Sequence, residues 1–98
     1  MAAYIIAEHT ITDPAKFEEY RTKVGSIIAK YSGRYITKPG SHAVLEKENA
    51  VWQPERVVII EFPDMAALKA WYHSPEYQPL IALRQAAAKD MLITLEGA

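Results

Sequence analysis

The sequence predicts an α+β sandwich, in which helices cover one face of an antiparallel β-sheet. Three observations predict it. The hydrophobic patterns along the chain come in the order strand, helix, two strands, helix and strand. The chain has 98 residues, so we treat 1–98 as a single domain. Hydrophobic residues make up 50% of it and charged residues 23%, which is typical of a folded globular chain rather than a disordered one.

The first part of the chain reads as a strand followed by a helix. Residues 3–11 form the strand. Asp13 is the expected N-cap of the helix, and Pro14 occupies the first helical position, where a missing N–H costs nothing. We expect Gly33 to end the helix in the left-handed conformation. The apolar side of the helix consists of Phe17, Tyr20, Val24, Ile27, Ile28 and Tyr31.

Two further strands are predicted next, over residues 34–38 and 42–47. Pro39 and Gly40 lie between them and indicate a turn or a bulge. Residues 48–55 then read as a loop.

The second half repeats the pattern of strand, helix and strand. Residues 56–62 (RVVIIEF) are the strongest strand of the chain. A helix that opens at Asp64 restarts at Ser74 and ends near Lys89, and residues 91–96 form the last strand. The complete order, βαββαβ, is that of a ferredoxin-like sandwich.

Three strands carry apolar residues on both of their faces, at 4–7, 57–60 and 91–93. In this fold the helices cover only one face of the sheet. Apolar surface left in water costs about 25 cal/mol per Å². We therefore expect a second, identical chain to cover the other face, which gives a homodimer through sheet faces. The alternative is that these are central strands with one face partly exposed.

Composition excludes several function classes. Lys and Arg number 11 against 12 Asp and Glu, for a formal charge of -1, so no nucleic-acid partner is expected. The absence of cysteine excludes disulfides, thiolate zinc sites and cysteine nucleophiles. The three histidines lack metal-ligand spacing, and no phosphate or dinucleotide motif occurs, so we predict no metal and no cofactor. The N-terminus resembles neither a signal peptide nor a membrane span, which favours a cytoplasmic protein without membrane contact.

Four segments together resemble a known family. They are TDPAKFEEYR, YSGRYITKPG, VVIIEFPDMAALKAWYHSPEYQPLIALR and a final strand that ends in EG. This pattern is similar to the family called domain of unknown function 1330, over nearly the whole chain. The resemblance implies a dimeric α/β barrel, a superfamily that includes cofactor-independent monooxygenases, isomerases and ligand-sensing domains. The family has no agreed activity, so the resemblance assigns no catalytic residue.

Arg84 and Glu61 are the two charges in unexpected places. Arg84 lies at the centre of an apolar helical stripe, and Glu61 lies near the end of the most apolar strand. We expect both to point between sheet and helices and to pair there, directly or through a ligand or water. The pair would then be either a structural ion pair or the polar end of a small pocket. The remaining alternative is that both reach solvent.

Further candidates are one histidine and two tyrosines. His73 precedes Ser74-Pro75 and reads as a cation at a helix C-terminus. A general base is possible at any of the three histidines, His9, His42 and His73, and the neighbours of His73 favour it slightly. Tyr20 and Tyr77 could present hydroxyls to a planar guest, or could be core residues. Ser74 reads as a helix cap, Trp71 as a flank residue of its helix, and Trp52 as a dimer contact.

The sequence thus favours a small-molecule site between sheet and helices. If the site is catalytic, cofactor-independent oxygenation or isomerisation fits best. Glu61 or His73 would then move protons, Arg84 would stabilise negative charge, and Tyr20 or Tyr77 would orient the ligand. The alternatives are a non-catalytic ligand-sensing module with the same pocket and a purely structural dimer.

Overall fold

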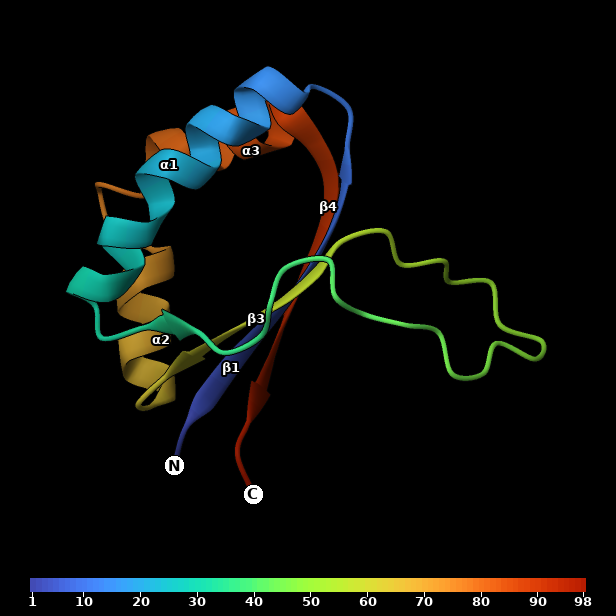
Figure 1. Ribbon diagram of the computed structural model, residues 1–98. Coiled ribbons are helices and arrows are strands. Elements are labelled where there is room, and N and C mark those ends of the chain that lie inside the picture. Colours follow the sequence, from blue (N-terminus) through green and yellow to red (C-terminus); the bar gives the residue numbers. More distant parts are fainter.

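The computed structural model describes residues 1–98 as a four-stranded antiparallel sheet with three helices on one of its faces (Figure 1). The strands are β1 (Ala3–Ile11), β2 (Arg34–Tyr35), β3 (Val57–Phe62) and β4 (Ala88–Glu96). The helices are α1 (Pro14–Lys30), α2 (Met65–Tyr72) and α3 (Gln78–Ala87). The strand order in the sheet is β2-β3-β1-β4, so the predicted ferredoxin-like sandwich is confirmed.

The register of the sheet decides which side chains face the helices. Strand β1 is central and pairs antiparallel with both β3 and β4. Its burial alternates, so that Ile5, Ala7 and His9 point toward the helices. In β3 the inward residues include Ile60 and Phe62. The core therefore fills the space between one sheet face and the three helices.

The predicted N-cap Asp13 and the predicted helix start at Asp64 are both confirmed. The Asp13 carboxylate accepts a hydrogen bond from the backbone N–H of Lys16 at 3.1 Å, and Pro14 is the first residue of α1. The Asp64 carboxylate does the same for α2, where it accepts from the N–H of Ala67 at 2.8 Å. These side chains satisfy backbone donors that a helix start leaves unpaired.

The end of α1 differs from the prediction. Ser32, with φ 68°, is the left-handed residue, and Gly33 is not. Gly33 is needed for close packing instead, because a Cβ on it would lie 2.5 Å from Cε1 of Phe62 and 2.8 Å from Cγ2 of Ile28. Phe62 is fully buried, so its ring has little freedom to move.

The predicted strand over 42–47 does not form, and β2 covers only the first two residues of the expected 34–38. Residues 36–56 instead form a long connection that projects from the sheet, away from the helices (Figure 1). Leu45 is 100% exposed and finds no neighbouring strand. A strand without a partner and without a buried face is not stable, which explains the difference.

The last helix and strand also have different bounds. Helix α3 begins at Gln78, with Pro79 in its first turn, and β4 begins at Ala88 rather than at residue 91. The early start of β4 follows from the length of β1, because Ala88 pairs with Ile11.

The face of the sheet opposite the helices carries the second set of apolar side chains that the sequence indicated. Met91 is 65% exposed, Ile93 47% and Leu95 49%, all on β4. Ile6 and Ile59, on the neighbouring strands, are half-buried and paired across the sheet. In a single chain this face has no cover. Separately, none of the three helices has the length and hydrophobicity to cross a membrane.

The contact at Gly33 generates a stability prediction. Gly33→Ala should lower the free energy of unfolding by about 1–3 kcal/mol, because the new methyl group overpacks Phe62 and Ile28. Gly25→Ala is the control, since a Cβ there meets nothing within 4 Å and removes a flexible residue from α1. It should raise stability by up to about 1 kcal/mol. Urea unfolding measures both, and equal effects would contradict the packing argument.

Candidate functional site

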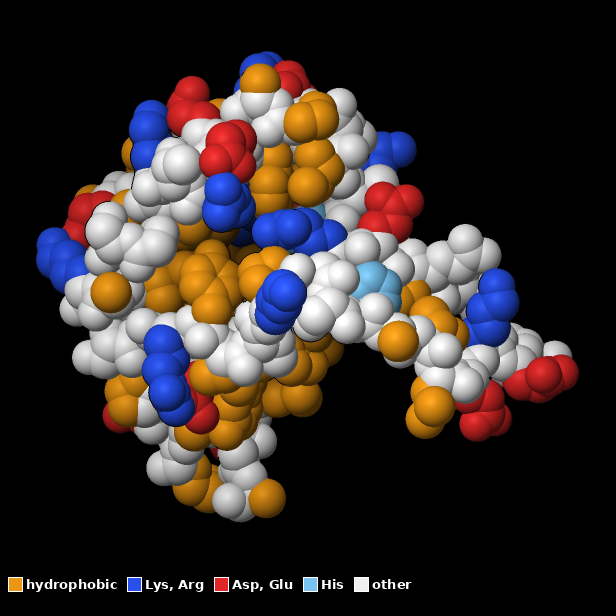
Figure 2. Space-filling view, in the orientation of Figure 1, with side chains coloured by type: hydrophobic (Ala, Val, Ile, Leu, Met, Phe, Trp, Pro, Cys, Tyr) orange, Lys and Arg blue, Asp and Glu red, His pale blue; other side chains and the backbone are white.

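A cavity of about 260 Å³ lies between the sheet and α1. Its size is just below the range of about 300–1,000 Å³ typical of ligand pockets, so it suits a compact molecule. Figure 2 shows a hydrophobic hollow on this side of the molecule with Lys and Arg side chains beside it. The cavity is lined by Ala7, His9, Phe17, Tyr20, Arg21, Tyr35, Pro39, Arg56, Val58, Ile60, Trp71 and Leu92.

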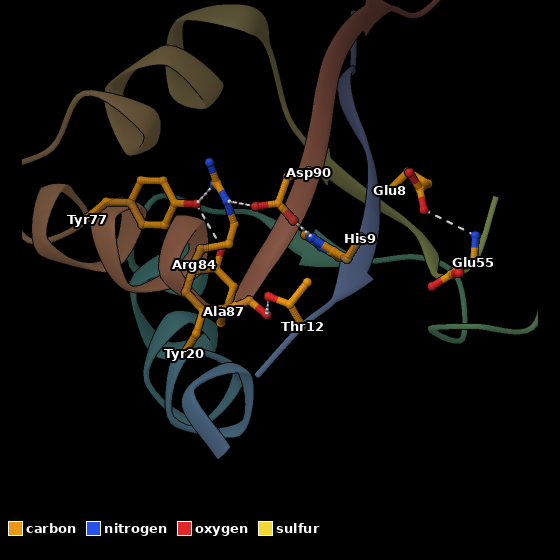
Figure 3. Close-up of polar contacts among 9 residues, drawn as sticks. All are labelled: Glu8, His9, Thr12, Tyr20, Glu55, Tyr77, Arg84, Ala87 and Asp90. Atoms are coloured by element: carbon orange, nitrogen blue, oxygen red, sulfur yellow. Dashed lines mark hydrogen bonds and ion pairs between the residues drawn. The ribbon is translucent and has the colours of Figure 1, made fainter. Parts of the chain in front are cut away.

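Five side chains form a continuous hydrogen-bonded series behind this cavity, which we call the buried polar chain (Figure 3). The hydroxyls of Tyr20 and Tyr77 lie 2.8 Å apart. Arg84 donates from Nη1 to the Tyr77 hydroxyl at 2.6 Å and from Nε to the carboxylate of Asp90 at 2.9 Å. The other Asp90 oxygen lies 2.5 Å from Nδ1 of His9. The two end members, Tyr20 and His9, both line the cavity.

Sheet register and helix position bring these residues together. His9 and Asp90 are direct partners in the β1–β4 ladder and point to the same side. Arg84 lies in the last turn of α3, six residues before Asp90, and Tyr77 precedes the first turn of the same helix. Tyr20 belongs to the buried stripe of α1. Four elements therefore contribute to one series of contacts.

The guanidinium of Arg84 is the charge at the centre of the series, with a side chain only 4% exposed. Burial opposes its charged form, but Tyr77, Tyr20 and the Asp90 carboxylate raise its pKa above the ordinary value. Burial also raises the pKa of Tyr20, and the neighbouring Tyr77 hydroxyl raises it further. Burial raises the pKa of Tyr77 as well. Both phenols are therefore neutral hydrogen-bond donors near pH 7, beside a permanent cation.

The direction of the hydroxyl protons follows from burial. The Tyr77 oxygen accepts from Arg84, and Tyr77 is completely buried. A buried hydroxyl proton without an acceptor is costly, so Tyr77 is expected to donate to Tyr20. Tyr20 then keeps its own O–H free at the cavity. At the other end, His9 lines the cavity and uses only Nδ1 in a side-chain hydrogen bond to the protein, which leaves Nε2 without a protein partner.

The predicted contact between Glu61 and Arg84 is wrong. Glu61 lies on the face of β3 opposite the helices, where it accepts from Nη2 of Arg34 at 2.9 Å and from Nε at 3.0 Å. Successive side chains of a strand point to opposite faces of the sheet. Ile60 and Phe62 point toward the helices, so Glu61 between them must point to the other face. Arg84 pairs with Asp90 instead.

The other predicted residues divide into two groups. Tyr20 and Tyr77 meet Arg84 as part of the buried polar chain. His73 is the exposed C-cap residue of α2 and lines a separate cavity of about 210 Å³ against β4. Ser74 does not cap a helix as predicted, because α3 begins later, with Tyr77 as its N-cap residue; the Ser74 hydroxyl instead accepts from the N–H of Tyr77 at 3.3 Å in the preceding turn.

Two residues have roles that the sequence reasoning missed. The sequence places Trp71 on the flank of its helix, but in the structure it is fully buried and lines the cavity between the sheet and α1. Asp90 was not singled out at all. The only sequence signal for it was a carboxylate at the start of an apolar strand, six residues after a buried arginine.

Comparison with known proteins identifies related chains. The family model described as Domain of unknown function (DUF1330) matches residues 2–98. No curated protein matches the chain. Among solved structures, a protein of unknown function from Rhodopseudomonas palustris has a TM-score of 0.80 and 18% identity, covering 99% of this chain and 82% of that one.

Two further solved structures share the fold. SnoaB, a cofactor-independent oxygenase from Streptomyces nogalater, has a TM-score of 0.67 and 16% identity, covering 99% of this chain and 93% of that one. A dimeric ferredoxin-like protein of unknown function from Jannaschia sp. CCS1 has a TM-score of 0.67 and 14% identity, covering 99% and 100%. At such identities these likenesses show the fold alone.

The order of the buried polar chain predicts unequal effects of removing its two hydroxyls. Tyr77→Phe should lower the free energy of unfolding by about 1.5–3 kcal/mol, because it leaves a buried arginine N–H unpaired. Tyr20→Phe should cost less, about 1–1.5 kcal/mol, because the group that it leaves without an acceptor is the neutral Tyr77 O–H rather than a charged guanidinium. Urea unfolding of both variants measures the difference. A Tyr20→Phe variant at least as destabilised as Tyr77→Phe would contradict this order.

Proposed function

The chain belongs to the family described as Domain of unknown function (DUF1330), and from the geometry of its cavity we propose that it binds a compact, partly aromatic small molecule there and removes a proton from it. The observation that carries this proposal is the buried polar chain, whose two ends reach the cavity wall with complementary chemistry. One end offers a base and the other offers a hydrogen-bond donor.

His9 is the proposed base. Asp90 accepts from Nδ1 and thereby holds the imidazole in the tautomer that leaves a lone pair on Nε2. A C–H or O–H proton of the ligand passes to Nε2, and the electron pair remains on the ligand as an enolate or phenolate. His9 thus takes the proton-moving role that the sequence analysis gave to Glu61 or His73.

Tyr20 is the proposed donor to the oxygen that becomes negative. Its O–H hydrogen-bonds that oxygen, while Tyr77 and Arg84 behind it supply a fixed positive field. Because these groups are held by the core, they need no rearrangement when the charge develops. Arg84 acts through the two tyrosines and does not touch the ligand.

Proton removal is the step common to the two reaction classes that the sequence favoured. An isomerase returns the proton at another carbon of the enolate. In a cofactor-independent oxygenase the carbanion reacts with dioxygen. SnoaB, described as a cofactor-independent oxygenase, offers a fold-level analogy for the second class. The cavity itself supports the shared first step.

The proposed assembly is a homodimer in which a second copy covers the open sheet face. The support is the exposed row of Met91, Ile93 and Leu95, an apolar surface that water disfavours. The structure from Jannaschia sp. CCS1 is described as a dimeric ferredoxin-like protein. The connection 36–56, with Trp52 58% exposed, projects on the same side and would reach the second copy.

Deuterium exchange tests the proposed base. Acetophenone is a compact aromatic ketone, and proton NMR in D₂O follows exchange of its methyl hydrogens. The wild type should accelerate exchange above the buffer rate, and His9→Gln should lower the protein-catalysed rate about 100-fold or more. His73→Gln is the control and should leave the rate unchanged. Equal rates in wild type and His9→Gln would remove His9 from the role. Saturable binding without exchange would support the non-catalytic module.

Light scattering tests the proposed dimer. The wild type should give twice the 11.0 kDa mass of the chain, and Ile93→Lys should shift it toward the monomer because a charge enters the apolar face. Ala66→Lys is the control, because it introduces a lysine on the exposed side of α2, and this variant should remain dimeric. A wild type that stays at the mass of one chain at micromolar concentration would contradict the assembly.

A further inference from the structure

Two residues of the cavity wall each carry a buried hydrogen-bond donor that no protein group satisfies. They are Nε of Arg56 and Nε1 of Trp71, two fully enclosed side-chain nitrogens without a partner. Both residues line the same cavity. Buried donors are nearly always paired in folded proteins, so two orphans in one cavity indicate an acceptor that binds there.

The charged side chains that line the cavity are all basic. Its lining includes two arginines and no aspartate or glutamate. Arg21 is already held by Glu18, which accepts from its Nη2 at 2.7 Å and its Nε at 3.0 Å. Arg56 has no such carboxylate, and its nearest charge partner in the cavity would be a ligand. A site of this kind favours an anion.

The position of Arg56 is fixed from two sides. Its Cζ lies 5.4 Å from the centre of the Phe17 ring, a distance at which the ring attracts a cation. Its backbone oxygen accepts from the N–H of His9 at 2.9 Å. The backbone of Arg56 thus lies beside the proposed base, and its guanidinium lies over Phe17, another residue of the cavity wall.

Trp71 contributes to the same wall near the Tyr20 end of the buried polar chain. Its ring packs on the Tyr77 ring with the centroids 4.1 Å apart, and Tyr77 bonds to Tyr20. The indole N–H and the Tyr20 hydroxyl are therefore donors contributed from neighbouring parts of the core. A ligand oxygen at this end could accept from either of them.

We infer that the ligand is a planar carboxylate, bound with its carboxylate at Arg56 and with a second oxygen, carbonyl or phenolic, toward Trp71 and Tyr20. This inference rests on the proposed function, since it names the class of molecule that occupies the same cavity. It assigns to Arg56 the recognition of charge, separate from the proton transfer at His9. Planar carboxylates match the fork geometry of a guanidinium, and the aromatic walls match a flat body.

A matched pair of probes tests the inference. 4-Hydroxybenzoate and 4-hydroxybenzamide have nearly the same shape and differ in charge at one end. Isothermal titration calorimetry on the full chain should give the benzoate an affinity about tenfold or more above that of the benzamide. Arg56→Gln should reduce this ratio to within about twofold, mainly by weakening benzoate. Lys23→Gln, a change at an exposed cation of α1 that does not line the cavity, should keep the wild-type ratio.

The outcomes separate this inference from the proposed function. Saturable binding of both probes with equal affinity would leave the proposed cavity in place and overturn the carboxylate assignment. The same would follow if Arg56→Gln, shown by circular dichroism to be folded, retained the wild-type ratio. If Arg56→Gln does not fold, the ratio of benzoate to benzamide affinity in the wild type alone tests the carboxylate assignment. Binding of neither probe to the wild type would count against the cavity as a ligand site and would overturn both proposals.

Discussion

The interior of this protein depends on the burial of one guanidinium. Arg84 is 4% exposed, and a charge removed from water is tolerated only where its partners are arranged around it. Asp90 and Tyr77 are those partners, and each has a second partner of its own, His9 and Tyr20. One positive charge thus connects the central strand, the first helix, the last helix and the edge strand β4. Because the same connections end at the cavity, the requirement to satisfy Arg84 also orients the groups that would act on a ligand.

The two faces of the sheet have different tasks. The inward face, with the helices, encloses the core and the cavity. The outward face carries apolar side chains that a single chain leaves in water, together with the exposed ion pair of Glu61 and Arg34. An exposed pair of this type contributes little to stability, so the apolar side chains dominate the energetics of that face. A second copy would complete this face without disturbing the buried polar chain on the other.

Much of the fold could be predicted from the sequence because local signals and global order agree. Asp13 and Asp64 begin their helices as expected, and the order of elements is correct. The central position of Arg84 on an apolar stripe correctly indicated its burial. The partner of Arg84 could not be predicted. The strand RVVIIEF is apolar on both faces, so the sequence does not show which face of the sheet Glu61 occupies. Only the pairing of His9 with Asp90 across two strands, far apart in the sequence, places the right carboxylate beside Arg84. Residues 42–47 show the same limit, because strand propensity forms no strand where no partner lies alongside.

The proposed chemistry requires that Asp90, fixed by Arg84, selects the tautomer of the neutral His9 ring. Nitrogen-15 NMR of the imidazole ring, at a pH where the ring is neutral, measures this directly in the wild type. We predict that the proton of His9 resides on Nδ1, facing Asp90, and that Nε2 shows the shift of an unprotonated nitrogen. A neutral ring that carries its proton on Nε2 would contradict it, because the cavity would then face a donor at the position where the proposed chemistry needs a base.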